Sequence, residues 1–243
     1  MTTLLIHSSG LSGRQWRHLQ DRLPPPSYAP DLAGYPSGPV WTDGPAWPVD
    51  HQHILSIIDA LEGPIDLVGH SYGGAIALKA ARTRRHRIRR LVVHEPVLWG
   101  CIRSNGRAES GAVINSFEET GFFDPETGGD AVWMARFVGF WGGPNAWEEM
   151  PPRHQAAFLA VGRKVFREVC DLGKDETPAA AFDELDIPLL LTVGEASPAI
   201  EREVCDILAA RHPRRELRTL PGGHMSPVTS PDAFTRAACD FLS

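Results

Sequence analysis

The chain has 243 residues, and at this size roughly three quarters of the unfolded surface becomes buried, so one enclosed domain, alone or with an insertion, is expected. Its 24 basic and 30 acidic side chains give a formal charge of −6, which argues against nucleic acid or an anionic membrane as the main partner. No segment reaches the ~18 apolar residues that span a bilayer, and the N-terminus lacks the features of a secretory signal.

The four cysteines are scattered and form no CxxC pair, which argues against the common zinc and redox motifs and favours a reducing compartment. We therefore expect a cytoplasmic protein that uses neither a metal nor another cofactor. A small-molecule substrate is the expected partner, and a homodimer stays open.

In chain order, short apolar runs alternate with longer helical patterns, which is typical of strand–helix–strand units on a parallel sheet. Six strands are expected, at Thr3–His7, Ser27–Ala29, Ile65–Gly69, Leu91–His94, Pro188–Val193 and Glu216–Leu220. Five helices are expected, at Ser12–Leu23, Val49–Leu61, Tyr72–Arg84, Pro198–Arg211 and Ser230–Leu242. The predicted fold class is α/β with a mostly parallel sheet.

The third expected strand runs directly into residues 69–73, Gly-His-Ser-Tyr-Gly, and then into an Ala-rich helix. This fits the G-x-S-x-G nucleophile elbow, in which the serine lies on a sharp turn and the glycines leave room for strand and helix to approach each other. The pattern alone is weak, but between a strand and a helix it is strong. It predicts Ser71 as the nucleophile and the backbone N–H of Tyr72 as an oxyanion donor.

Between residues 97 and 183 the strand-like runs disappear and the sequence becomes helical and rich in Phe and Trp. We interpret this segment as a helical cap inserted into a core made of residues 1–96 and 184–243. An insertion after the carboxyl end of a strand lies where open α/β sheets bind ligands. Most of its aromatic side chains are expected to pack inside the cap, with a minority facing a pocket.

A nucleophilic serine needs a base, and the loop after the last expected strand supplies one in residues 221–225, Pro-Gly-Gly-His-Met. His224 on this loop can reach back across the carboxyl edge of the sheet. His51 and His53 are spaced like a metal-binding pair but lack further ligands nearby in the sequence. His224 is therefore the predicted base.

Three segments together resemble the α/β-hydrolase superfamily: Gly-His-Ser-Tyr-Gly-Gly at 69–74, Pro-Gly-Gly-His-Met at 221–225, and Ala-Pro-Asp-Leu-Ala-Gly-Tyr at 29–35. The resemblance covers essentially the whole chain, including the cap. Because the chain starts at what looks like the family's third strand, the two N-terminal antiparallel strands are expected to be absent. In this family a His-Gly-x run supplies the second oxyanion donor; here residues 7–9 read His-Ser-Ser, which implies the N–H of Ser9.

The resemblance leaves the acid of the triad open. The family's usual pattern, Gly-Glu-x-Asp-Pro, here reads Gly-Glu-Ala-Ser-Pro at 194–198, so Ser197 stands in place of the aspartate. Some members carry the acid after the strand that follows the elbow helix, where this chain has Glu95. We favour Glu95, with Glu195, another acid or a Ser–His dyad as alternatives.

The sequence thus predicts a serine hydrolase that cleaves an ester, thioester or lactone of a small, largely apolar substrate through an acyl-enzyme. The same scaffold also supports carbon–carbon bond hydrolysis, acyl transfer or a cofactor-free rearrangement. A non-catalytic small-molecule binding protein is the alternative from a different class.

Overall fold

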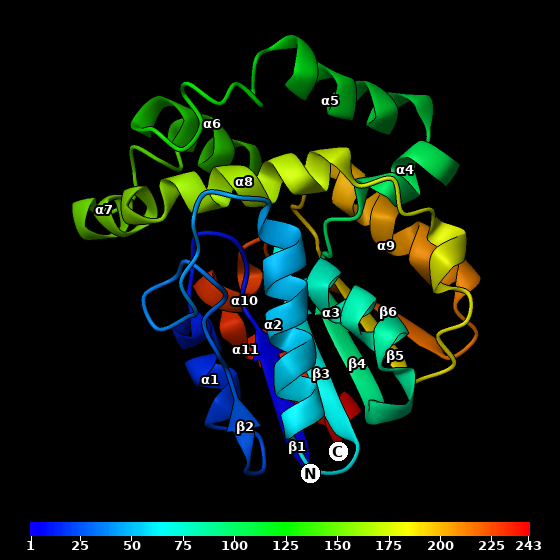
Figure 1. The fold of residues 1–243 in the computed structure, drawn as a ribbon. Helices are drawn as coiled ribbons and strands as arrows, with labels where there is room; N and C mark the ends of the chain where they lie inside the picture. The colour runs from blue at the N-terminus through cyan, green and yellow to red at the C-terminus, as the bar shows by residue number, and fades with distance from the viewer.

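In the computed structural model, which describes all residues from 1 to 243, six parallel strands form one sheet in the order β2-β1-β3-β4-β5-β6 (Figure 1). The strands are β1 (Thr2–Ile6), β2 (Ser27–Tyr28), β3 (Ile65–His70), β4 (Ile88–His94), β5 (Leu189–Gly194) and β6 (Arg215–Leu220). The expected mostly parallel sheet is confirmed. Because every strand is parallel, all carboxyl ends lie at one edge of the sheet.

The helices of the core are α1 (Arg17–Gln20), α2 (Ala46–Ala60), α3 (Tyr72–Thr83), α9 (Ala199–Arg211), α10 (Ser226–Thr229) and α11 (Pro231–Leu242). The expected helix at residues 12–23 is wrong in form: a 3₁₀ helix at Gly13–Trp16 precedes the single α-helical turn of α1. Gly13 and Trp16, three residues apart in the 3₁₀ helix, are both buried, and three-residue spacing aligns residues on one face of such a helix. The short helix α10 was not predicted.

The strands bury both faces of the sheet. Leu4 and Leu67 belong to the larger apolar cluster, with side chains from α2, α3 and α9. The next residues, Leu5 and Val68, belong to a second cluster with side chains from α1 and α11. This alternation follows from the two-residue period of a strand, and it explains why the central strands are apolar almost throughout.

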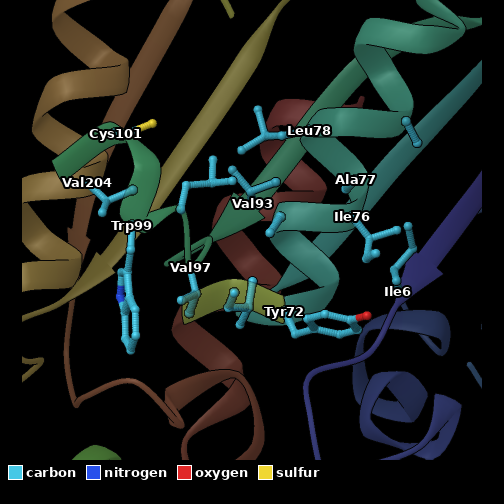
Figure 2. Packing of buried hydrophobic residues seen from close by; sticks show 14 of the residues in the cluster. Ile6, Tyr72, Ile76, Ala77, Leu78, Val93, Val97, Trp99, Cys101 and Val204 are labelled. Carbon is cyan, nitrogen blue, oxygen red and sulfur yellow. The ribbon is translucent and has the colours of Figure 1, made fainter. Parts of the chain in front are cut away.

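Figure 2 shows where α3 packs in the larger cluster. Leu78 of α3 lies beside Val93 of β4, and Ile76 of the same helix lies beside Ile6 of β1. The helix that follows the elbow is therefore held by apolar contacts along its length. This packing fixes the position of its first residue, at the carboxyl edge of the sheet.

Five helices lie between β4 and β5 and form a layer across the carboxyl ends of the strands, while both chain termini lie at the opposite end (Figure 1). They are α4 (Trp99–Asn105), α5 (Ala108–Glu119), α6 (Ala131–Gly142), α7 (Pro152–Ala160) and α8 (Gly162–Lys174). We call this layer the cap. Helix α8 packs against α2 and α4, and α4 and α5 pack against α9. No helix in the structure is both long and apolar enough to traverse a lipid bilayer.

Candidate active site

The elbow between β3 and α3 holds Ser71 in a conformation that non-glycine residues rarely adopt, with φ 56° and ψ −120°. Its backbone N–H donates a 2.9 Å hydrogen bond to the carbonyl of His94 at the end of β4. A Cβ atom on Gly69 would lie 2.5 Å from the carbonyl oxygen of Gly73, and one on Gly73 would lie 2.4 Å from the carbonyl oxygen of Ile6. The sharp turn therefore requires glycine at both positions.

The structure brings Ser71, His224 and Glu95 together in one line of hydrogen bonds. The Oγ atom of Ser71 lies 2.9 Å from Nε2 of His224, and Nδ1 of His224 lies 2.7 Å from Oε2 of Glu95. All three side chains are buried. This is the geometry that a serine, a base and an orienting acid need for nucleophilic attack.

Glu95 follows β4 in the left-handed region of backbone space, with φ 42°. Its second oxygen, Oε1, accepts a 2.6 Å hydrogen bond from the backbone N–H of Gly194 and another from the hydroxyl of Ser197. Burial on its own would raise the pKa of this carboxyl, but the hydrogen bond and charge of His224 and the Gly194 N–H lower it to about 2. Glu95 is therefore ionised at neutral pH.

Glu195 lies apart from this arrangement. Its side chain is exposed, and it makes no hydrogen bond or ion pair. Ser197, which stands where the family pattern has aspartate, is a donor to Glu95. Of the two acidic candidates, the structure thus brings only Glu95 to His224.

The main chain of His224 is held by a buried histidine that the sequence reasoning did not single out. Nε2 of His70 lies 2.8 Å from the carbonyl oxygen of His224, and since a carbonyl only accepts, Nε2 must carry the proton. Nδ1 of His70 then accepts a 3.0 Å hydrogen bond from the side-chain NH₂ group of Gln15. The side-chain oxygen of Gln15 in turn accepts a 3.0 Å hydrogen bond from the backbone N–H of Ser8. Position 70 is the first variable residue of G-x-S-x-G, which was the available signal.

The two predicted oxyanion donors, Ser9 and Tyr72, both flank Ser71. Neither backbone N–H donates a hydrogen bond to the protein: Tyr72 opens α3, where the first N–H groups have no partner within the helix, and Ser9 lies in the loop after β1. The next N–H, of Gly10, is already bonded to the hydroxyl of Tyr35 at 2.8 Å. Ser9 and Tyr72 are thus left available to an incoming oxygen.

A buried charge cluster beneath the cap ties α8 to this loop and to α3. Nζ of Lys164 lies 2.6 Å from Oδ2 of Asp50 and 2.7 Å from Oε1 of Glu168. Both carboxylates are fully buried. The hydroxyl of Tyr72 donates to Asp50 at 2.8 Å, and that of Tyr35 donates to Glu168 at 3.0 Å. Burial raises the pKa of Glu168, and the charge of Lys164 opposes this rise. Sequence spacing did not indicate the cluster, because Tyr35 and Asp50 lie more than 100 residues before Lys164 and Glu168.

A cavity of about 20 Å³ lies between the elbow and the cap, enough for about one water molecule. Its lining combines two serines with apolar side chains, most of them aromatic. The lining residues are Ser9, Ser71, Val97, Trp99, Phe117, Phe122, Phe137, Phe140, Trp141, Val169 and Leu172. Of the ten Phe and Trp residues at positions 117–166, five line the cavity. Half of these aromatic residues therefore face the cavity, which is more than the expected minority.

With this fold and arrangement described, the class of protein follows. The chain belongs to the alpha/beta hydrolase family, whose model matches residues 3–237. A hydrolase from Pseudomonas aeruginosa has a similar structure, with a TM-score of 0.77 at 23% identity, covering 100% of this chain and 89% of that one. At this identity the likeness shows the fold alone.

Two curated relatives match parts of the chain. The lipase LipV of Mycobacterium tuberculosis is 37% identical over 101 residues, which cover 39% of this chain and 37% of the lipase. The 2-hydroxy-6-oxo-2,4-heptadienoate hydrolase of Pseudomonas putida is 34% identical over 141 residues, which cover 54% of this chain and 42% of that enzyme. The matches therefore span less than half the length of these relatives. The family and both names support a hydrolase.

Proposed function

We propose that this protein is a serine hydrolase that cleaves an ester, thioester or lactone of a small, largely apolar substrate through an acyl-enzyme. One observation carries the proposal: the hydroxyl of Ser71 borders an apolar cavity and lies 2.9 Å from Nε2 of His224, whose other ring nitrogen lies 2.7 Å from Glu95. A structural serine in a turn needs neither the base nor the buried carboxylate.

In the proposed reaction, the oxygen of Ser71 attacks the substrate carbonyl while its proton passes to Nε2 of His224. The carbonyl electron pair moves onto the oxygen, which the free N–H groups of Ser9 and Tyr72 stabilise. Collapse of this intermediate expels the leaving group, which takes the proton from His224. A water molecule then attacks the acyl-enzyme by the same steps. Glu95 keeps the imidazole in the required tautomer throughout.

The Pseudomonas putida relative favours a second candidate, hydrolysis of a carbon–carbon bond. The substrate in its name, a heptadienoate, is a carboxylate at neutral pH. The cavity here is lined by two serines and nine apolar side chains, without a cation. Burying an ionised carboxylate without a partner is strongly unfavourable. We therefore favour uncharged acyl groups and ester or thioester bonds.

The first test is covalent labelling with a fluorophosphonate, which reacts only with an activated serine. We expect the wild-type chain to be labelled and Ser71→Ala to remain unlabelled, with turnover of any ester lower by roughly 10³-fold or more. A folded Ser71→Ala protein with near-native turnover would end the proposal.

The second arm defines the substrate with p-nitrophenyl esters of graded acyl length, and with a dienoate as the carbon–carbon substrate. Each methylene that enters the cavity should contribute about 0.8 kcal/mol of binding, or about fourfold in kcat/KM, until the cavity is filled. A flat or falling series would contradict the apolar acyl pocket. Turnover of the dienoate with inert esters would favour the second candidate.

A further inference from the structure

Trp141, near the end of α6 in the cap, lies face to face with the imidazole of His224. The ring centroids are 4.0 Å apart and the planes are inclined by 21°, which makes this the shortest aromatic pair in the molecule. The indole also lines the cavity that Ser71 borders. Trp141 therefore touches both the predicted base and the space that a substrate would enter.

The contact between Trp141 and His224 bears on the reaction, because the charge of His224 changes when Ser71 attacks. When Nε2 takes the proton of Ser71, a neutral imidazole becomes a cation in a site that holds about one water molecule. The face of an indole attracts a cation, and this attraction is stronger where water is excluded. The same contact gives little to the neutral ring, so its effect falls mainly on the transition state.

We infer that Trp141 is a catalytic residue of the proposed serine hydrolase, whose indole face stabilises the imidazolium form of His224. In the step concerned, a bond forms between Oγ of Ser71 and the carbonyl carbon of the substrate, while the carbonyl π bond breaks and its electron pair moves onto the oxygen. The hydroxyl proton moves to Nε2, and the positive charge spreads over the imidazole beneath the indole. The inference rests on the proposed function, because it assigns a role within the same site.

Three other titratable side chains face the imidazole of His224. Glu95 accepts from its Nδ1, and the rings of His70 and His94 lie beside it, with the centroid of His70 at 5.0 Å. Burial lowers the pKa of His70 well below its usual range and that of His94 to about 4, so both rings are neutral near pH 7. Glu95 and Trp141 are thus the two groups that favour the cation.

The test measures how fast a fluorophosphonate inactivates wild type, Trp141→Phe and Trp141→Leu, at saturating probe and across pH. Fluoride leaves this probe without needing a proton, so the rate isolates the step in which His224 becomes charged. We expect the saturated rate to fall about 2- to 30-fold in Trp141→Leu and by less in Trp141→Phe, whose ring is a weaker cation partner. The acidic limb of the pH profile should move to lower pH in both variants.

Phe117→Leu is the matched control, because Phe117 lines the same cavity but packs on Trp99 and Phe122 rather than on His224. It should weaken probe binding and leave the acidic limb in place. Trp141 variants that change only probe binding, as this control does, would overturn the inference, and so would a rate for Trp141→Phe at or below that of Trp141→Leu. If Trp141→Leu does not fold, as judged by circular dichroism, Trp141→Phe decides. A wild-type chain that resists the probe would overturn the proposed function together with the inference.

Discussion

Glu95 and Glu195 occupy similar places in the sequence, since each directly follows a strand, yet their surroundings differ. Glu95 turns inward in a left-handed conformation and receives hydrogen bonds from His224, Gly194 and Ser197. These three donors compensate for the desolvation of a fully buried carboxylate. Glu195 stays in water, where a carboxylate needs no partner.

Glu95→Gln should keep the fold and lose activity. The amide oxygen can still accept from Gly194, but the NH₂ group would face Nδ1 of His224, which favours the wrong tautomer and gives no charge to the imidazolium. We expect kcat to fall by roughly 10³- to 10⁴-fold, as in triads where the acid becomes an amide. The comparison is with Glu195→Gln, which should retain wild-type kcat. The opposite ranking would move the acid to Glu195, and two silent variants would indicate a Ser–His dyad.

At the scale of elements, the sequence predicted what local pattern controls. All six strands were predicted to within three residues because β-branched and apolar runs end at Gly, Pro or polar residues. The elbow was predicted because its spacing is a steric requirement, which the close contacts at Gly69 and Gly73 now explain. Ser71 could be singled out for the same reason, and His224 because its loop follows the last strand.

What the sequence did not predict depends on contacts between distant segments. Trp141 stacks on a residue 83 positions away, and Lys164 bonds a residue 114 positions away. Neither pair leaves a periodic pattern, since only the packing of the cap on the core brings the partners together. Trp16 in the 3₁₀ helix likewise packs on Phe234 of α11, a residue that is distant in the sequence.

The elbow gives a prediction at this scale: Gly73→Ala should destabilise the fold and abolish labelling of Ser71. The added methyl group would meet the carbonyl oxygens of Ile6 and His7 at 2.4 Å, so β1 and α3 would have to move apart. The expected loss is about 2–4 kcal/mol in the free energy of unfolding, measured by urea denaturation. Gly111→Ala in α5 is the control, because nothing lies within 4 Å of its Cβ and alanine favours a helix. Equal stability of the two variants would contradict the steric explanation.

At the scale of the whole molecule, the interior holds titratable groups whose protonation differs between the folded and unfolded states. Burial lowers the pKa of His7 and of His94 to about 4 and that of His70 well below its usual range, and it also lowers the pKa of His51 and His212. Between pH 6.5 and about 4, His7, His70 and His94 are protonated when unfolded and neutral when folded. The unfolded state then binds more protons than the folded state. The contribution of these histidines to stability therefore decreases as the pH is lowered.

Two buried glutamates act in the opposite direction. Burial raises the pKa of Glu168, and it raises that of Glu201 well above the usual range, with the charge of Glu95 adding to the latter. Their folded-state pKa exceeds the unfolded one, so the folded state binds more protons and their contribution grows as pH falls toward about 4.5. Glu201 accepts only a 3.3 Å hydrogen bond from Trp99, and its Oε2 has no partner.

The histidines outnumber the glutamates, so stability should fall as the solution is acidified below pH 6.5. Three fully buried histidines each bind a proton on unfolding, whereas the two glutamates release at most one each, so the net proton uptake is positive and stability decreases as the pH falls. Glu95, with a pKa of about 2, adds its own loss only below about pH 4.5, so the two effects separate. Urea unfolding at pH 7.5, 6.5, 5.5 and 4.5, at constant ionic strength, measures the slope of the unfolding free energy against pH. A stability that stays flat or rises on acidification would show that the assigned protonation states are wrong. Glu201→Gln removes one opposing group: it should be more stable than wild type at pH 7.5, should lose that advantage by pH 4.5, and should therefore show the steeper slope.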